Sequence, residues 1–199
     1  MPNNLLCVSH CSDMAASRQA EDSTGHEKYM QLALDEARKS PPKPTNFCVG
    51  ACLVAPSSSG EDGELLMTGY TLECEGNTHA EQSCFIKLSQ QYGSDMEQLG
   101  ERLPRGTVLY TTMEPCNKRS VGNTPCVDRI LMLKRDDGSQ AVSTVYVGVS
   151  EPETFVGANV GMAKLEDASI RVEQVPGFED EILSVATAGH TKSTGDTST

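Results

Sequence analysis

The sequence predicts an α/β protein with three layers, α/β/α, and a central five-stranded mixed sheet. Three observations support this. Strand-like apolar runs alternate with helix-like segments, the first two runs are separated only by a turn-rich segment, and the later runs are separated by helical segments. A strand–helix–strand unit returns through a right-handed crossover, so its strands run parallel and its helix covers one face of the sheet. An antiparallel pair joined to such units gives a mixed sheet with helices on both faces.

The length and composition indicate one folded domain with two tails. The chain has 199 residues, of which 37% are hydrophobic and 22% charged, which is enough for one well-buried core. Residues 1–25 lack periodicity, and residues 188–199 are small and polar, so we expect both segments to be disordered. The folded domain is expected over residues 26–187.

The first half of this domain reads as a helix followed by a hairpin. Glu27–Lys39 has apolar residues at helical spacing and stops before a group of prolines, which cannot continue a helix. Phe47–Ala55 and Leu65–Thr71 are apolar runs joined by a segment rich in Ser, Gly and Asp. That pattern predicts an antiparallel pair of strands.

The second half alternates between helices and strands. Thr78, with Glu81 three residues later, predicts a capped helix that ends near Gly93. A buried strand follows at Val108–Met113, and a helix is expected to begin at Asn123–Pro125, with proline at its first position. The remaining elements are predicted as strand, helix, strand and helix at Val142–Val149, Val160–Ala168, Ile170–Val175 and Glu179–Ala188.

Charge and hydropathy restrict the class of partner. The formal net charge is −12 and the isoelectric point is near 4.7, so a nucleic acid would be repelled and a small metabolite is the expected ligand. No basic segment followed by a long apolar run occurs near residue 1, and no stretch approaches membrane length. We therefore expect a cytoplasmic protein with no membrane partner, whose eight cysteines are reduced and in part available to a metal.

Three short segments at predicted strand ends and helix starts carry the candidate chemistry. They are His79-Ala80-Glu81, Pro115-Cys116 and Pro125-Cys126. One imidazole and two thiolates are the three protein ligands that a catalytic zinc takes while it keeps a position for water. His79, Cys116 and Cys126 are therefore the predicted ligands of Zn²⁺, and a helix start beside Cys126 would favour its thiolate.

Glu81 is the candidate catalytic acid and base. A carboxylate beside activated water can accept its proton and deliver it to a departing amine, a role that a purely structural zinc site does not need. Each residue also has a structural interpretation: Glu81 in a capping box, His79 on the surface, and the cysteines as buried thiols. A zinc module that only binds a partner protein, with Cys84 or Cys74 closing the metal shell, remains an alternative.

The combination of HAE, Pro-Cys and a second cysteine resembles the cytidine deaminase-like superfamily. The segment TNFCVGACLV resembles a strand of that fold. EGNTHAEQ at Glu75–Gln82 and TMEPCNKRSVGNTPCVDRIL at Thr112–Leu131 are similar to the fungal-type diaminohydroxyphosphoribosylaminopyrimidine deaminases of riboflavin biosynthesis. The resemblance covers roughly Tyr29–Ile182. Arg119 stands where the superfamily usually has its second cysteine, and the resemblance places that ligand at Cys126, after a longer loop.

The resemblance also implies a substrate and the residues that contact it. It implies hydrolysis of 2,5-diamino-6-ribitylamino-4(3H)-pyrimidinone 5'-phosphate to 5-amino-6-ribitylaminouracil 5'-phosphate and ammonia, with zinc as the cofactor and a homodimer by analogy. The loop between the two cysteines carries groups that suit a phosphate. The candidate substrate-binding residues are Asn46, Asn77, Ala80, Lys118, Arg119, Ser120 and Asn123.

Two alternatives remain open from the sequence. One is a deaminase of a nucleotide such as dCMP, or of tRNA, within the same superfamily; the net charge of −12 disfavours the tRNA enzyme. The other is the non-catalytic zinc-binding module.

Overall fold

The computed structural model describes residues 25–57, 62–150 and 160–190, and these residues contain a five-stranded sheet. The strand order is β2-β1-β3-β4-β5; β1 pairs antiparallel with both β2 and β3, whereas β3, β4 and β5 are parallel. The predicted mixed sheet is thereby confirmed. The strands are β1 Gly50–Ala55, β2 Glu64–Tyr70, β3 Thr107–Met113, β4 Val142–Val149 and β5 Arg171–Gln174.

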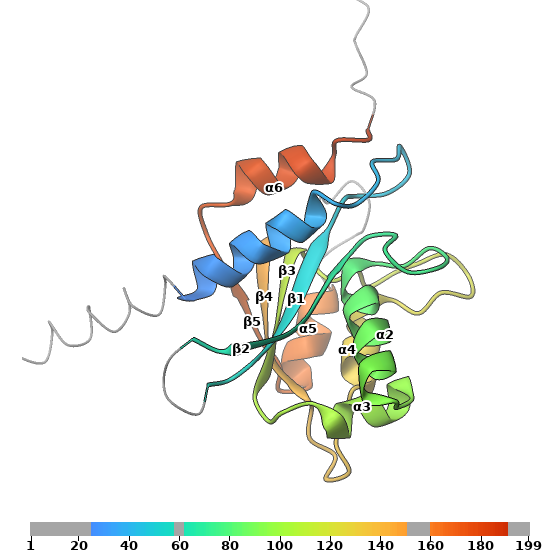
Figure 1. Cartoon of the computed structure of the whole chain (residues 1–199), viewed down its shortest axis with the longest axis vertical. Coiled ribbons are helices and arrows are strands. Elements are labelled where there is room, and N and C mark those ends of the chain that lie inside the picture. Colours follow the sequence, from blue (N-terminus) through green and yellow to red (C-terminus); the bar gives the residue numbers. More distant parts are fainter. Residues whose placement is uncertain (1–24, 58–61, 151–159, 191–199) are drawn as a thin grey trace, which may run out of the picture.

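Helices cover both faces of the sheet, as Figure 1 shows. An N-terminal helix over residues 25–37 lies with α6 on one face. The other four helices lie on the opposite face. The bounds are α2 Ala80–Tyr92, α3 Met96–Arg102, α4 Cys126–Met132, α5 Val160–Asp167 and α6 Glu179–Ala186.

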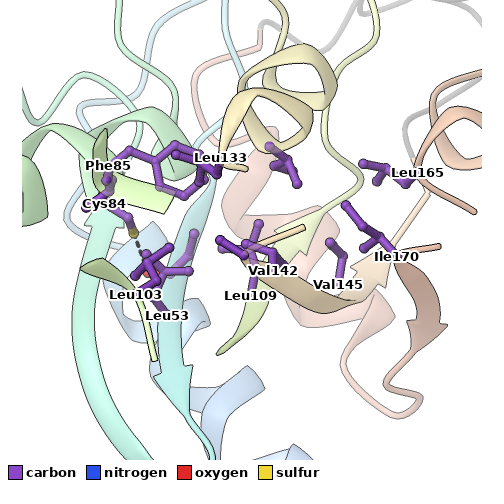
Figure 2. Close-up of a cluster of buried hydrophobic side chains, with 14 of the residues drawn as sticks. Leu53, Cys84, Phe85, Leu103, Leu109, Leu133, Val142, Val145, Leu165 and Ile170 are labelled. Atoms are coloured by element: carbon purple, nitrogen blue, oxygen red, sulfur yellow. Dashed lines mark hydrogen bonds between the residues drawn. The ribbon is translucent and has the colours of Figure 1, made fainter. Parts of the chain in front are cut away.

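The core consists of two apolar clusters separated by the sheet. Leu53 and Leu109 face the side of α2, where they join the fully buried Phe85 (Figure 2). Their strand neighbours Cys52 and Tyr110 belong to the cluster on the other side. Since successive strand residues point to opposite faces, a strand buried on both sides reads as a continuous apolar run. This explains why β1 and β3 lack apolar–polar alternation.

Two local features differ from the prediction. The N-cap of α2 is His79, with no side-chain hydrogen bond, and the Thr78 hydroxyl bonds instead to the backbone of Cys74. The expected capping box is therefore wrong, because Thr78 is held by the preceding loop. The short helix α3 was not predicted; its burial of Leu99 and Gly100 depends on contact with the chain near Lys134, which local periodicity does not reveal.

The described residues continue past the end of α6 to residue 190. Residues 187–189 form a turn after α6, a bend follows at His190, and His190 contacts Asn46 and Phe47. The expected disordered segments otherwise fall on residues 1–24 and 191–199, which lie outside the described residues. Among the described helices, none combines the length and apolar character required to cross a bilayer.

Candidate active site

Three separate segments bring His79, Cys116 and Cys126 to one point. His79 is the N-cap of α2, Cys116 follows the end of β3, and Cys126 is the first residue of α4. The Nδ1 atom of His79 lies 3.4 Å from the Sγ atom of each cysteine, and all three ligand atoms lie within 4.8 Å of one another. The structure thus joins residues that are up to 47 positions apart in the chain.

These atoms fit a zinc ion. Zinc binds sulfur at about 2.3 Å and imidazole nitrogen at about 2.0 Å, so a tetrahedral site separates the nitrogen from each sulfur by roughly 3.5 Å and the two sulfurs by roughly 3.8 Å. The observed nitrogen–sulfur distances of 3.4 Å are slightly shorter, so the three side chains need to move apart only a little to admit the ion. Three protein ligands with a water-accessible fourth position are typical of a catalytic site rather than a structural one. Neither Cys84 nor Cys74 belongs to this group of metal-ligating side chains.

The two cysteines have opposite acid–base environments. The pKa of Cys116 is lowered to about 4, chiefly because the Cys126 thiol donates a hydrogen bond to it, with His79 adding to the effect. The backbone N–H of Cys126 also donates to Cys116 Sγ at 3.4 Å. The same shared hydrogen bond, together with burial, raises the pKa of Cys126. A cation between the two sulfurs would release the shared proton.

Glu81 lies directly beside this group. It is the second residue of α2, its side chain is 2% exposed, and its Oε2 atom lies 3.3 Å from Cys126 Sγ. Burial raises the pKa of the carboxyl group, and the nearby His79 opposes that shift. His79 and Glu81 converge because one caps the helix and the other occupies its open first turn. A carboxyl group with a raised pKa is suited to exchange protons near neutral pH.

A cavity of about 1130 Å³ opens onto His79, Glu81 and Cys116. Most of the predicted substrate-binding residues line it: Asn46, Asn77, Lys118, Arg119 and Ser120.

Two predicted substrate-binding residues do not line this cavity. The side chain of Ala80 is fully buried, and Asn123 is exposed and donates to the Ser120 hydroxyl at 3.1 Å. Asn123 therefore shapes the loop around Ser120 instead of facing the cavity.

Arg119 fixes the loop between the two cysteines against the start of α2. Its guanidinium donates to the backbone carbonyl of Asn77 at 2.6 Å and to the side-chain carbonyl of Gln82 at 3.0 Å. Lys118 and Ser120, on either side, are exposed at the cavity. The basic side of the cavity is therefore anchored by Arg119 and presents its neighbours to a ligand.

Several cavity residues were not predicted from the sequence, among them Lys43, Thr45, Phe47, Leu72 and His190. Phe47 was assigned only to an apolar strand, and His190 to a polar tail. Neither has a local pattern that indicates a site, since both reach the cavity through contacts between distant segments.

Comparison with known families agrees with this geometry. Residues 23–137 match the family described as the cytidine and deoxycytidylate deaminase zinc-binding region. The chain belongs to this family. Zinc is accordingly its metal, and His79, Cys116 and Cys126 form the group that can hold it.

Individual relatives extend the family assignment. The chain is 37% identical over 165 residues to a diaminohydroxyphosphoribosylamino-pyrimidine deaminase of Schizosaccharomyces pombe; the match covers 83% of this chain and 36% of that protein. It is 44% identical to the Aspergillus oryzae Rib2 deaminase (C-terminal deletion mutant), with a TM-score of 0.76 and coverage of 84% of this chain and 93% of that structure. A structure of the Aspergillus oryzae protein in complex with DARIPP is 43% identical with a TM-score of 0.74, covering 83% and 92% of the two chains. The resemblance identified from the sequence is thereby confirmed.

Proposed function

We propose that this protein deaminates 2,5-diamino-6-ribitylamino-4(3H)-pyrimidinone 5'-phosphate by hydrolysis, to give 5-amino-6-ribitylaminouracil 5'-phosphate and ammonia in riboflavin biosynthesis. The observation that carries this proposal is the buried Glu81 carboxyl group beside three zinc-ligating side chains at an open cavity. The substrate class is supported by the relatives, one named a diaminohydroxyphosphoribosylamino-pyrimidine deaminase and one crystallised with DARIPP. The chain spans 36% of the length of the Schizosaccharomyces pombe relative, so the proposal concerns the deaminase reaction alone.

The proposed mechanism assigns the proton transfers to Glu81. Zinc, when bound, supplies Lewis-acid activation of the water that attacks the carbon bearing the amine. Glu81 accepts one proton of that water and delivers it to the adjacent ring nitrogen; it then takes the remaining proton of the added hydroxyl and passes it to the amine, which leaves as ammonia while the carbonyl forms. Its buried position favours the protonated form between these steps. The reaction thus consumes one water and releases one ammonia.

The walls of the cavity supply the groups that hold the substrate. We assign the ring to the backbone of Ala80 and Cys116 and to the Asn46 and Asn77 side chains. The phosphate is assigned to Lys118 and its neighbours in the loop that Arg119 anchors. Lys118 and Ser120 are exposed at the cavity, which suits a charged group that stays close to solvent.

An ammonia-release assay tests the substrate. We expect turnover of the diaminopyrimidine phosphate and little or none of cytidine, dCMP or tRNA. Turnover confined to the last three would overturn the assignment in favour of a nucleotide or tRNA deaminase. Removal of the phosphate from the diaminopyrimidine should raise KM if Lys118 and Ser120 contact it.

The non-catalytic zinc module has less support. Cys84 would have to turn toward the metal, but its thiol donates to the Ala51 carbonyl at 3.6 Å within the apolar core. The homodimer and the cytoplasmic location rest on family analogy and on composition, respectively. Light scattering of the purified chain and localisation of a tagged full-length chain test these two proposals.

A further inference from the structure

The loop that carries Asn46 packs against the residues that follow α6. Lys43 and Asn46 form a β-bridge around a tight turn at Pro44 and Thr45, and the turn lines the cavity. The turn itself contributes one long backbone hydrogen bond, from Asn46 N to Lys43 O at 3.5 Å. Such a weak bond is not enough to fix the turn, so its position depends on what packs against it.

The residues that follow α6 contact both arms of this turn. The backbone of Gly189 lies so close to Lys43 that a Cβ atom there would be 2.3–2.7 Å from the Lys43 backbone. On the other arm, the Nε2 atom of His190 donates to the Asn46 carbonyl at 3.1 Å, and the His190 ring lies 4.8 Å from the Phe47 ring. Two residues after Asn46, the backbone N–H of Cys48 donates to the carbonyl of Ala186 at 2.9 Å. Figure 1 shows the chain leaving α6 beside this loop.

The side chain of Asn46 depends on this support. Among the described residues its Nδ2 atom is buried and has no hydrogen-bond partner. No hydrogen bond within the described residues therefore fixes that amide nitrogen, so its place depends on the position of the Asn46 backbone. An unpaired buried amide costs free energy unless a ligand satisfies it, so a substrate group that accepts from Asn46 gains most when the backbone is held still.

We propose that His190 is a positioning residue for substrate binding: through its hydrogen bond to the Asn46 carbonyl, it holds the turn at residues 43–46 in the conformation that meets the substrate. His190 itself lines the cavity, on the wall formed with that turn. The inference extends the proposed function, because it concerns the binding of the same substrate. His190 thereby has a role in the site in addition to the zinc ligands, Glu81 and the loop between the two cysteines.

Three substitutions at one position separate the hydrogen bond from the ring contact. His190→Gln keeps an N–H donor at the place of Nε2 but loses the ring. His190→Phe keeps a ring against Phe47 but loses the donor, and His190→Ala loses both. We expect KM for the diaminopyrimidine phosphate to rise about tenfold in the Phe and Ala variants, which corresponds to one hydrogen bond, with kcat within threefold of the unmodified protein. The Gln variant should return KM to within threefold.

Gly189→Ala provides an independent test of the contact between the residues after α6 and the turn at residues 43–46. The atoms that its Cβ would meet are backbone atoms of Lys43, which cannot rotate away. We expect it to raise KM as His190→Ala does. Ser184→Ala, an exposed position on α6, is the matched control and should leave KM and kcat unchanged.

Hydrogen exchange measured by mass spectrometry supplies a readout without substrate. In the zinc-loaded full chain, residues 43–49 should exchange faster in His190→Ala, His190→Phe and Gly189→Ala than in His190→Gln or Ser184→Ala. Equal KM and equal exchange across these variants would overturn the inference. Failure of the unmodified protein to deaminate the substrate would instead overturn the proposed function, and the exchange experiment would still decide the role of His190.

Discussion

At the scale of single residues, burial and neighbours decide what a side chain can do. Cys84, in the second turn of α2, and Cys126, the first residue of α4, are both fully buried. Cys84 donates to the carbonyl of Ala51 in an apolar cluster, and burial raises its pKa. Cys126 lies 3.4 Å from the imidazole nitrogen of His79 and 3.3 Å from a Glu81 oxygen. The same type of side chain is therefore part of the apolar core in one place and part of a group that can hold a metal in the other.

Glu81→Gln should separate metal binding from catalysis. Gln keeps the size of the side chain but cannot carry the proton, so we expect kcat to fall at least 10²- to 10⁴-fold, the usual contribution of general acid–base catalysis. Zinc content should remain near one per chain, because the three ligands are unchanged. Ammonia release and elemental analysis measure the two quantities. Activity close to that of the unmodified protein would exclude the mechanism.

Cys126→Ala should lose zinc, whereas Cys84→Ala should keep it. The first substitution leaves two ligands, too few for a stable site. The second removes one sulfur from the core and should lower the free energy of unfolding by about 1 kcal/mol without touching the metal. Metal analysis together with denaturant unfolding distinguishes the two. Equal zinc content in both variants would contradict the assignment of Cys126.

At the scale of elements, the close packing of α2 on β2 places His79 and Glu81. Gly69 of β2 faces the first turn of α2, where a Cβ atom would lie 2.5 Å from the Ala80 carbonyl oxygen and 2.8 Å from the Cys84 nitrogen. A salt bridge of 2.5 Å between Lys87 and Glu73 ties the helix to the loop that follows β2. The start of α2 therefore sits at the cavity because a glycine lets the helix approach the sheet.

Gly69→Ala should displace the start of α2 and weaken the site. The added methyl group meets backbone atoms, so we expect a loss of about 1–3 kcal/mol in the free energy of unfolding, with weaker zinc binding and lower kcat.

Gly93→Ala is the matched control for this substitution. Gly93 has a left-handed conformation at the other end of α2, with nothing within 4 Å of an added Cβ. That variant should lose about 1 kcal/mol from backbone strain alone while zinc affinity and kcat stay unchanged. Loss of zinc affinity in both variants would show that general destabilisation is the cause.

At the scale of the whole molecule, the site joins parts of the fold that are distant in the chain. Cys116 follows the carboxyl end of β3, which is the place where ligands bind in α/β sheets. The turn at residues 43–46 and His190 after α6 also line the cavity. Metal binding requires the native arrangement, so it should be coupled to the stability of the entire domain.

Removal of zinc should lower the melting temperature. An ion that binds only the folded chain stabilises it by about 2.7 kcal/mol when its free concentration is 100 times its Kd. We expect a chelator to lower the Tm of the unmodified protein and added zinc to restore it, while Cys126→Ala should respond to neither. Differential scanning fluorimetry across a zinc titration measures the effect. A Tm that does not depend on zinc would contradict a preformed site that is specific to the native state.

Local patterns in the chain were enough to predict the fold class, the positions of most elements, and the zinc-binding chemistry. Apolar periodicity is a local property, and it located β4 at Val142–Val149 with the observed bounds. The candidate ligands could be proposed from the sequence because His79, Cys116 and Cys126 each stand in a short motif whose residue types are uncommon together.

The tertiary structure alone decided the remaining features, because they arise from contacts between segments far apart in the chain. It showed that His79, not Thr78, caps α2, because the preceding loop engages the Thr78 hydroxyl. It also brought His190 against Asn46, 144 positions away. A polar residue after the last helix has no local pattern that indicates such a contact, since only the packing of α6 beside the N-terminal helix brings the two together.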